Sequence, residues 1–151
     1  MCLHRLRRQA GLDPPIAPHN VVMVCVRAND PLEKELIDNA GVEIVPVADI
    51  KGDCRQLQDA MKRLSEAVDL IYVHFDVDAL DPSELANLRL TEPDGPRRTE
   101  LAAAVKMIMA HPKAAAFGVA DINPEQDVDG QIIQSAFTVI RGAIEGRATG
   151  V

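Results

Sequence analysis

Three aspartates follow one apolar segment and are the residues of this sequence best placed to do chemistry. The stretch LIYVHFDVDALDP, residues 70–82, ends an apolar run with Asp76, Asp78 and Asp81. Side chains two residues apart in a strand point to the same side, so Asp76 and Asp78 are expected to point together. Two adjacent carboxylates repel each other unless a positive charge lies between them. Mg²⁺ or Mn²⁺ relieves that repulsion and prefers oxygen ligands, so the pair is a candidate metal site.

Asp81 has a simpler explanation than metal binding. It precedes Pro82, and an aspartate in that position commonly caps a turn with its own side chain. The calcium-loop pattern is not met, because Leu80 stands where a third oxygen ligand is needed and Asp81 where that loop has glycine. Asp-rich turns after strands are common, so a turn without any metal is the structural alternative for the whole stretch.

The elements that must position these carboxylates alternate between strand and helix. Apolar runs rich in β-branched residues predict strands at residues 20–27, 42–47, 70–75 and 114–122. Capping residues and an apolar face that repeats every three or four residues predict helices at residues 30–41, 54–68, 99–112 and 129–146. Thr99 is the expected N-cap of the third helix. The core face of the fourth helix is expected to carry Ile133, Ala136, Phe137, Ile140 and Ile144. The turn formers in residues 83–98 predict a loop.

This alternation predicts an α/β fold: a three-layer α-β-α sandwich with a mainly parallel sheet, in a single domain over residues 1–151. The carboxyl ends of such strands are the usual ligand-binding edge, which is where Asp76 and Asp78 fall. Four apolar strands also leave apolar sheet edges. We therefore expect association with another copy or with strands of another chain.

Composition excludes some classes of partner. The 151 residues carry a formal net charge of −7, which argues against nucleic acid, because a phosphate-binding surface needs excess Lys and Arg. No apolar run is long enough to cross a membrane. Cys2, Cys25 and Cys54 have no C-x-x-C spacing and are interpreted as reduced thiols of a cytoplasmic protein.

The segment HFDVDALDP resembles the D-x-D segment of the ureohydrolase family, which comprises arginase, agmatinase and formimidoylglutamase. Residues 20–50 are similar to the family segment that precedes it, and AFGVADINPEQD, residues 116–127, to a segment ending in Glu-Val-Asn-Pro. The resemblance implies a partial arginase-like fold, a binuclear Mn²⁺ centre that includes Asp76 and Asp78, and hydrolysis of a C–N bond in a linear amidine. Asp121, where the family has glutamate, is implied to anchor the guanidino group of the substrate. No residue is assigned as a catalytic acid or base.

The resemblance covers only the second half of the family's domain. The family's Gly-Gly-Asp-His and Asp-Ala-His-x-Asp segments, which supply further metal ligands, have no counterpart in the 151 residues. The histidines do not replace them: His4, His19 and His111 lie in or beside predicted surface segments. His74 precedes Asp76 by two residues and is interpreted first as a core histidine and second as a ligand.

Two functional hypotheses follow. The chain is an arginase-family hydrolase that is incomplete on its own, or it is a non-catalytic fragment or pseudo-subunit that acts through oligomerisation. Its partners would be a divalent metal, a guanidino or amidino small molecule, and either another copy or a chain that supplies the missing half. A phosphotransferase of the dehalogenase type also starts from a D-x-D strand end, but near its N-terminus, whereas Asp76 and Asp78 lie in mid-chain.

Overall fold

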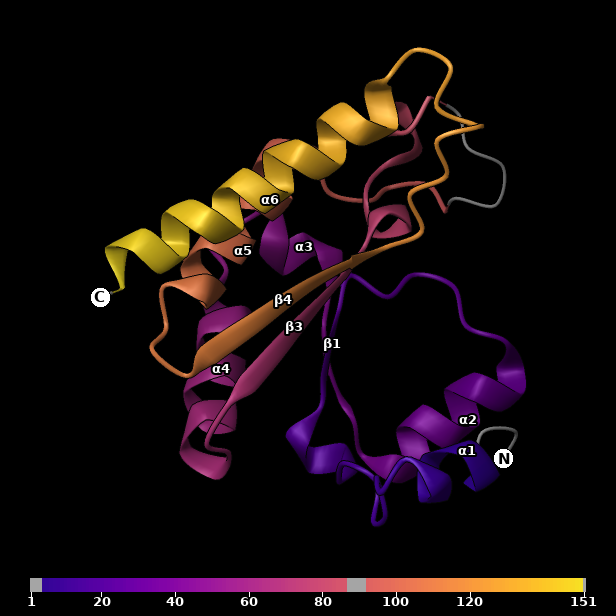
Figure 1. The fold of residues 1–151 in the computed structure, drawn as a ribbon, viewed down its shortest axis with the longest axis vertical. Helices are drawn as coiled ribbons and strands as arrows, with labels where there is room; N and C mark the ends of the chain where they lie inside the picture. The colour runs from indigo at the N-terminus through magenta and orange to yellow at the C-terminus, as the bar shows by residue number, and fades with distance from the viewer. Residues whose placement is uncertain (1–3, 87–91, 151) are drawn as a thin grey trace.

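Parallel strands and intervening helices make up this protein (Figure 1). The computed structural model describes residues 4–86 and 92–150. In order, the helices and strands are α1 His4–Gln9, the 3-10 helix η1 Pro18–Asn20, β1 Val22–Val24, α2 Pro31–Ala40, β2 Glu43–Val45, α3 Val47–Ile50, α4 Arg55–Ala67, β3 Ile71–Asp76, the 3-10 helices η2 Val77–Ala79 and η3 Pro82–Glu84, α5 Arg98–Met109, β4 Ala114–Ala120 and α6 Gln131–Thr149. The predicted α/β class is confirmed.

The strands form two separate pairs, where the sequence predicted one sheet of four. β1 pairs with β2 in parallel, from Val22 opposite Glu43 to Val24 opposite Val45. β3 pairs with β4 in parallel and ends with Asp76 opposite Ala120. In the part of the chain that the structure describes, no hydrogen-bonded ladder joins the two pairs. The prediction of a continuous sheet was therefore wrong for this chain, although every pairing is parallel as expected.

The ends of the first elements follow from a few residues. β1 is shorter than the predicted strand 20–27, because Cys25 has a φ of 62°, which an extended strand does not allow. α2 begins and ends as predicted: Asp30 accepts a hydrogen bond from the Leu32 amide at 3.0 Å, and Gly41 ends the helix with a φ of 65°. Pro46 precedes a short helix, α3, that the sequence did not predict.

Two buried aspartates hold helix N-termini from outside the helix. Both oxygens of Asp49 accept backbone hydrogen bonds at the start of α4, at 3.0 and 2.9 Å. Asp127 does the same for the first turn of α6, accepting from the amides of Ile132 and Ile133 at 2.8 and 3.0 Å. Each carboxylate is only 7% exposed. A negative charge at a helix N-terminus satisfies its free N–H groups and its dipole, which explains why these two charges are buried.

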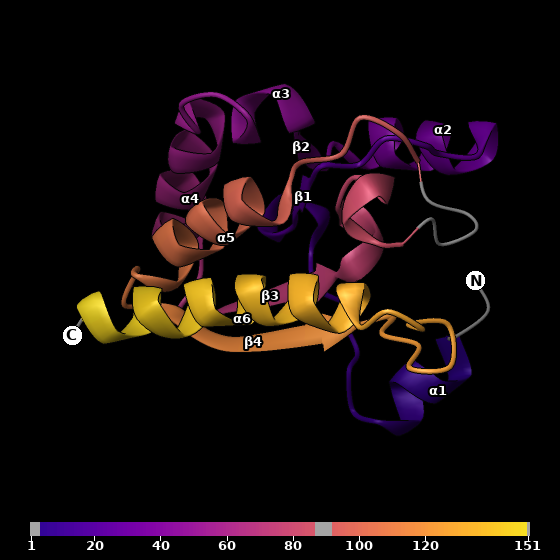
Figure 2. The ribbon, with the colours of Figure 1, turned by 90° about the horizontal axis from the view of Figure 1, so that it is seen from above.

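Helices α5 and α6 pack side by side along their length, and both views show α6 running beside β4 (Figures 1 and 2). Three glycines spaced four residues apart allow this approach: Gly142, Gly146 and Gly150. A Cβ at Gly142 would lie 2.5 Å from the backbone oxygen of Ala102, and Gly146 and Gly150 meet α5 backbone more closely still. Only glycine fits where two helix backbones meet in this way.

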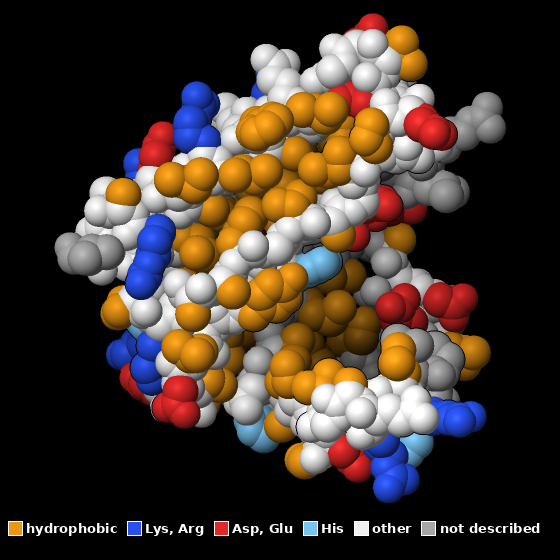
Figure 3. Space-filling view, in the orientation of Figure 1, with side chains coloured by type: hydrophobic (Ala, Val, Ile, Leu, Met, Phe, Trp, Pro, Cys, Tyr) orange, Lys and Arg blue, Asp and Glu red, His pale blue; other side chains and the backbone are white. Residues whose placement is uncertain are grey.

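The buried face of α6 shares Ala136 with the predicted face but otherwise consists of other residues. Ile132, Ala136 and Val139 are buried, whereas Phe137 and Ile144 are each 65% exposed. The predicted set is one residue out of phase because the glycines, which carry no apolar side chain, mark the packed face. Figure 3 shows the resulting hydrophobic patch over α6 and β4. Across the described residues, no helix is long and apolar enough to cross a bilayer.

Candidate metal centre

Three carboxylates gather at the carboxyl ends of β3 and β4. Asp76, Asp78 and Asp121 each offer an oxygen, and these oxygens lie within 4.8 Å of one another. Asp76 is half-buried and the other two are exposed. Within residues 4–86 and 92–150, no other group of three His, Cys, Asp or Glu side chains could hold a metal ion in this way. The structure therefore brings together all three residues that the sequence singled out for metal and substrate binding.

A turn, and not strand alternation, brings Asp76 and Asp78 together. Asp76 is the last residue of β3, and Asp78 lies in the 3-10 turn η2, where the Asp78 amide donates to the Asp76 carboxylate at 3.2 Å. The third member comes from the parallel register, since Ala120 lies opposite Asp76 and Asp121 follows it with a φ of 64°. The sequence correctly predicted that Asp76 and Asp78 lie close together. It did so for the wrong reason, because β3 ends at Asp76 and Asp78 is not part of the strand.

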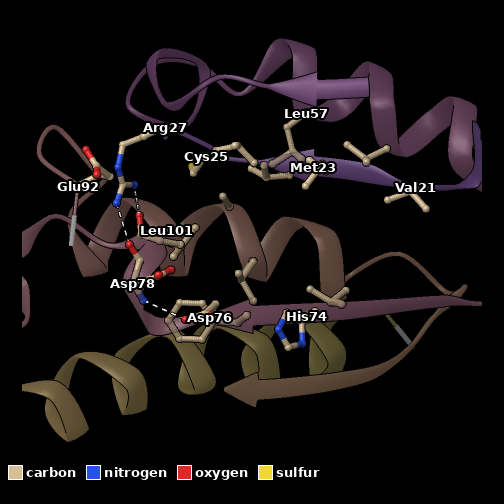
Figure 4. A pocket seen from close by; sticks show the side chains of 18 of the residues that line it. Val21, Met23, Cys25, Arg27, Leu57, His74, Asp76, Asp78, Glu92 and Leu101 are labelled. Atoms are coloured by element: carbon tan, nitrogen blue, oxygen red, sulfur yellow. Dashed lines mark hydrogen bonds between the residues drawn. The ribbon is translucent and has the colours of Figure 1, made fainter. Parts of the chain in front are cut away.

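Arg27, which the sequence analysis did not assign to the site, fixes the turn that carries Asp78. Its guanidinium donates to the backbone oxygens of Asp78 at 2.7 Å, Ala79 at 2.6 Å and Leu80 at 3.3 Å (Figure 4). One side chain that follows β1 thus holds three successive backbone carbonyls in the turn that follows β3. An arginine directly after an apolar strand was the available signal, but nothing in the sequence shows which carbonyls it reaches.

The negative charges of Asp76 and Asp121 make ionisation of the neighbouring Asp78 carboxyl less favourable. Partial desolvation of its carboxyl group, although the residue is exposed, raises the pKa of Asp78. The charge and the hydrogen bond of Asp76 raise it further, and the charge of Asp121 adds to this. The Arg27 guanidinium acts in the opposite direction but has the smallest effect. A bound divalent cation would reverse the repulsion, because each carboxylate then faces a positive charge.

The donor set fits one hard divalent cation. Three carboxylates supply the oxygen ligands that Mn²⁺ or Mg²⁺ prefers, and water would complete the coordination. A pair of ions needs more ligands than these three carboxylates provide. His74 does not join the cluster: its Nδ1 lies 3.3 Å from the Tyr72 hydroxyl. The first interpretation of His74, as a core histidine, was also wrong, because its side chain is exposed.

Asp81 is separate from the cluster and caps its turn as predicted. Its Oδ1 accepts from the Ser83 amide at 3.0 Å and from the Ser83 hydroxyl at 2.5 Å. These hydrogen bonds hold the pKa of the Asp81 carboxyl below its usual range. The next residues are anchored to the last two helices: the Ser135 hydroxyl donates to the Glu84 carbonyl at 2.8 Å, and Arg98 forms an ion pair with Glu84.

The prediction of a loop at residues 83–98 is confirmed only in part. η3 and the start of α5 extend into it, and residues 87–91 lie outside the described residues. The helix begins at Arg98, one residue before the predicted N-cap Thr99, because the Glu100 carboxylate accepts from the Arg97 amide at 2.7 Å.

A groove of about 660 Å³ separates β1 from β3, and we call it the slot. Its walls come from β1, β3 and α5, and the side chains along it are mainly apolar. Figure 4 shows Met23 and His74 along the slot and Arg27 with Asp78 closing one end of it. In Figure 3 the slot is a hollow with hydrophobic side chains inside. The metal-binding candidates therefore lie at the end of an apolar groove.

An α/β fold with parallel strands that places three carboxylates at the strand ends defines a protein with a candidate cation site. The chain belongs to the arginase family, whose model matches residues 2–145. It is 30% identical over 126 residues to an arginase of Agrobacterium fabrum, an alignment that covers 80% of this chain and 39% of that protein. An arginase of Brucella suis is likewise 30% identical over 122 residues, with 40% of it covered.

Solved structures show the same fold. The arginase of Bacillus caldovelox matches with a TM-score of 0.81 and 25% identity, over 93% of this chain and 48% of that one. Formimidoylglutamase from Bacillus subtilis matches with a TM-score of 0.81 over 93% of this chain and 46% of that chain, at 20% identity, which shows the fold alone. The chain thus spans about half the length of the proteins that it matches.

Proposed function

We propose that this chain supplies half of the active site of a metal-dependent hydrolase that cleaves a C–N bond in a linear amidine or guanidino compound. Asp76 and Asp78 would hold Mn²⁺, and Asp121 would anchor the cationic group of the substrate. The observation that carries the proposal is the convergence of these three carboxylates at one end of a parallel pair, in a chain of the arginase family.

Each residue has a defined part in such a site. When bound, the metal makes a coordinated water more acidic and so supplies a nucleophile at neutral pH. Asp76 and Asp78 contribute ligand oxygens, and η2, fixed by Arg27, sets the angle between them. A carboxylate pairs well with a planar guanidinium, which suits Asp121 as an anchor. Its oxygen is also close enough to the other two to serve as a third ligand, and the experiment below separates the two roles.

We further propose that the chain does not turn over substrate alone. Described residues 4–86 and 92–150 bring only three carboxylates to the site, and a binuclear centre needs ligands that lie elsewhere. The same observation favours the second candidate function, a non-catalytic arginase-like subunit that works through association. Its free thiols Cys25 and Cys54 fit a reducing compartment, so we place the protein in the cytoplasm, as a single domain.

Calorimetric titration with Mn²⁺ tests the site. We expect one weak binding event that is lost in Asp76→Asn and Asp78→Asn and retained in Asp81→Asn, a matched control from the same segment outside the cluster. If Asp121 is an anchor, Asp121→Asn keeps Mn²⁺ binding, and if it is a ligand, binding weakens as in the other two. Mn²⁺ binding that survives both Asp76→Asn and Asp78→Asn would overturn the assignment.

Urea release from arginine and agmatine separates the two candidate functions. We expect none from this chain alone. Release on addition of the unmatched portion of the Agrobacterium fabrum arginase, abolished by Asp78→Asn, supports the hydrolase. Complex formation without release, whether or not Mn²⁺ is present, supports the non-catalytic subunit.

A further inference from the structure

We propose that two copies of this chain pair through the exposed apolar face of α6, with the two helices antiparallel about a twofold axis. This goes beyond the proposed function, because it assigns a surface and a partner that do not involve the carboxylate cluster. The pairing needs neither metal nor substrate, so the pairing and the metal site can fail separately.

The solvent side of α6 carries a row of large apolar side chains. The row, which we call the seam, consists of Ile133, Phe137, Ile140 and Ile144, spaced four, three and four residues apart. This is the spacing of the a and d positions of a heptad, by which one helix packs against another. Phe137 and Ile144 are each 65% exposed. The opposite face of α6 meets the α5 backbone at Gly142 and Gly146, so α6 has two packing faces and the seam is left facing solvent.

The seam is self-complementary in one antiparallel register. A twofold axis through the middle of the seam sets Phe137 of one copy beside Ile140 of the other. The same axis sets Ile133 of one copy beside Ile144 of the other. Each seam residue therefore meets another seam residue, which a twofold interface between identical chains requires. This match of the surface to itself favours a second copy as the partner.

Charge favours the antiparallel arrangement over the parallel one. Asp129 precedes α6 and Arg147 lies in its last turn, and both are exposed. In the antiparallel register Arg147 lies level with Gly130 of the other copy and so beside its Asp129. A parallel pair would set Asp129 beside Asp129 and Arg147 beside Arg147. The antiparallel pair also places the negative end of each helix dipole beside the positive end of the other.

The size of this surface suits a reversible dimer. α6 has 19 residues, which is about 28 Å of helix at about 1.5 Å per residue. Figure 3 shows the apolar surface running along α6 and onto β4. A single helix pair with its margins lies at the lower end of the range for specific interfaces, so we expect dimer and monomer to be in equilibrium.

Sedimentation equilibrium of the full chain, from micromolar to submillimolar concentration and with a chelator present, tests the pairing. We expect a monomer–dimer equilibrium. Phe137→Glu buries one unpaired charge from each copy and should raise the dimer Kd by at least about tenfold, and Ile144→Glu should do the same. Leu36→Glu is the matched control, because Leu36 is 70% exposed on α2, and it should leave the dimer Kd unchanged.

A charge exchange tests the register. Arg147→Glu and Asp129→Lys should each raise the dimer Kd at low ionic strength, because each sets like charges together. The double variant restores opposite charges and should dimerise more tightly than either single variant. Effects of the two substitutions on the dipole of their own helix would add and could not produce this rescue. The exchange decides the question if neither glutamate variant of the seam folds.

Three results would overturn the proposal. One is a chain that sediments as a monomer at every concentration. Another is a dimer whose Kd changes in neither Phe137→Glu nor Ile144→Glu, which would assign association to a different surface. The third is a monomer that binds the unmatched portion of the Agrobacterium fabrum arginase and loses that binding in Phe137→Glu, which would assign the seam to that portion. The calorimetric test of Mn²⁺ binding is independent of all three.

Discussion

Replacing Arg27 tests whether the turn that carries Asp78 is held in place from β1. In Arg27→Met the apolar stem is kept, but the bonds of 2.6 and 2.7 Å to the Ala79 and Asp78 carbonyls are lost. A hydrogen bond from a charged donor contributes about 1.5–3 kcal/mol, and we take the lower value because one bond is exposed and the other only part-buried. The two together predict a loss of about 3 kcal/mol, a large part of the total stability of about 5–15 kcal/mol that a domain has.

Equilibrium unfolding in urea measures this loss. Arg27→Lys should fall between wild type and Arg27→Met, because one ammonium cannot reach three carbonyls as a guanidinium does. Arg55→Met is the control: within the part of the chain that the structure describes, Arg55 pairs with exposed Asp53 alone, and such pairs contribute less than about 1 kcal/mol. An Arg27→Met chain within about 1 kcal/mol of wild type would refute the reasoning and show that η2 holds its shape without β1.

Three further predictions concern the frame around the site. Asp127→Ala removes two buried bonds at the start of α6 and should cost about 3 kcal/mol in unfolding free energy, with Asp127→Asn intermediate; equal values for the two variants would contradict this. Gly146→Ala puts a Cβ into the Lys106 backbone and should lower stability by about 2 kcal/mol, and an unchanged urea midpoint would refute the close approach. Burial raises the pKa of the Cys25 thiol from 9.0 to about 11, so the unfolded chain ionises first and stability falls by about 2–3 kcal/mol between about pH 9 and pH 11. Cys25→Ala should lose that part of the pH dependence, and parallel wild-type and variant pH profiles would count against it.

The sequence was sufficient where a pattern depends on neighbours in the chain. Asp30 and Gly41 bound α2 as predicted, and Asp81 caps its turn, because these contacts span only a few residues. The sequence did not predict the interactions between residues that are far apart in the chain. Arg27 reaches carbonyls more than fifty residues away, and Asp49 caps a helix that begins after another N-cap residue, Cys54.

The errors about α6 and about the sheet have one physical cause. Periodicity ranks helix faces by apolar side chains, so it selected Ile133 and Phe137, whereas the face that packs is made partly of glycine and has little apolar side chain to detect. Similarly, apolar strands predicted a continuous sheet because a local pattern cannot show which strands are adjacent. Asp121 was singled out together with Asp76 and Asp78 because the resemblance supplied the long-range pairing that periodicity lacks, and the structure places the three carboxylates close together, while their roles stay predictions.

The split between β1–β2 and β3–β4 has a consequence for how the chain folds. Cooperative unfolding requires that breaking one part destabilises the rest, and a continuous ladder is a strong means of coupling. Here the region of α2, β1 and β2 is joined to the rest by Arg27 and by packing around α3 and α4. We therefore expect the β1–β2 region to open locally more often than the rest, with faster amide hydrogen exchange, while the core that Cys25 and Val45 share with Phe75 keeps global unfolding a single transition. The coupling between the two strand pairs is therefore carried by side chains and not by backbone ladders.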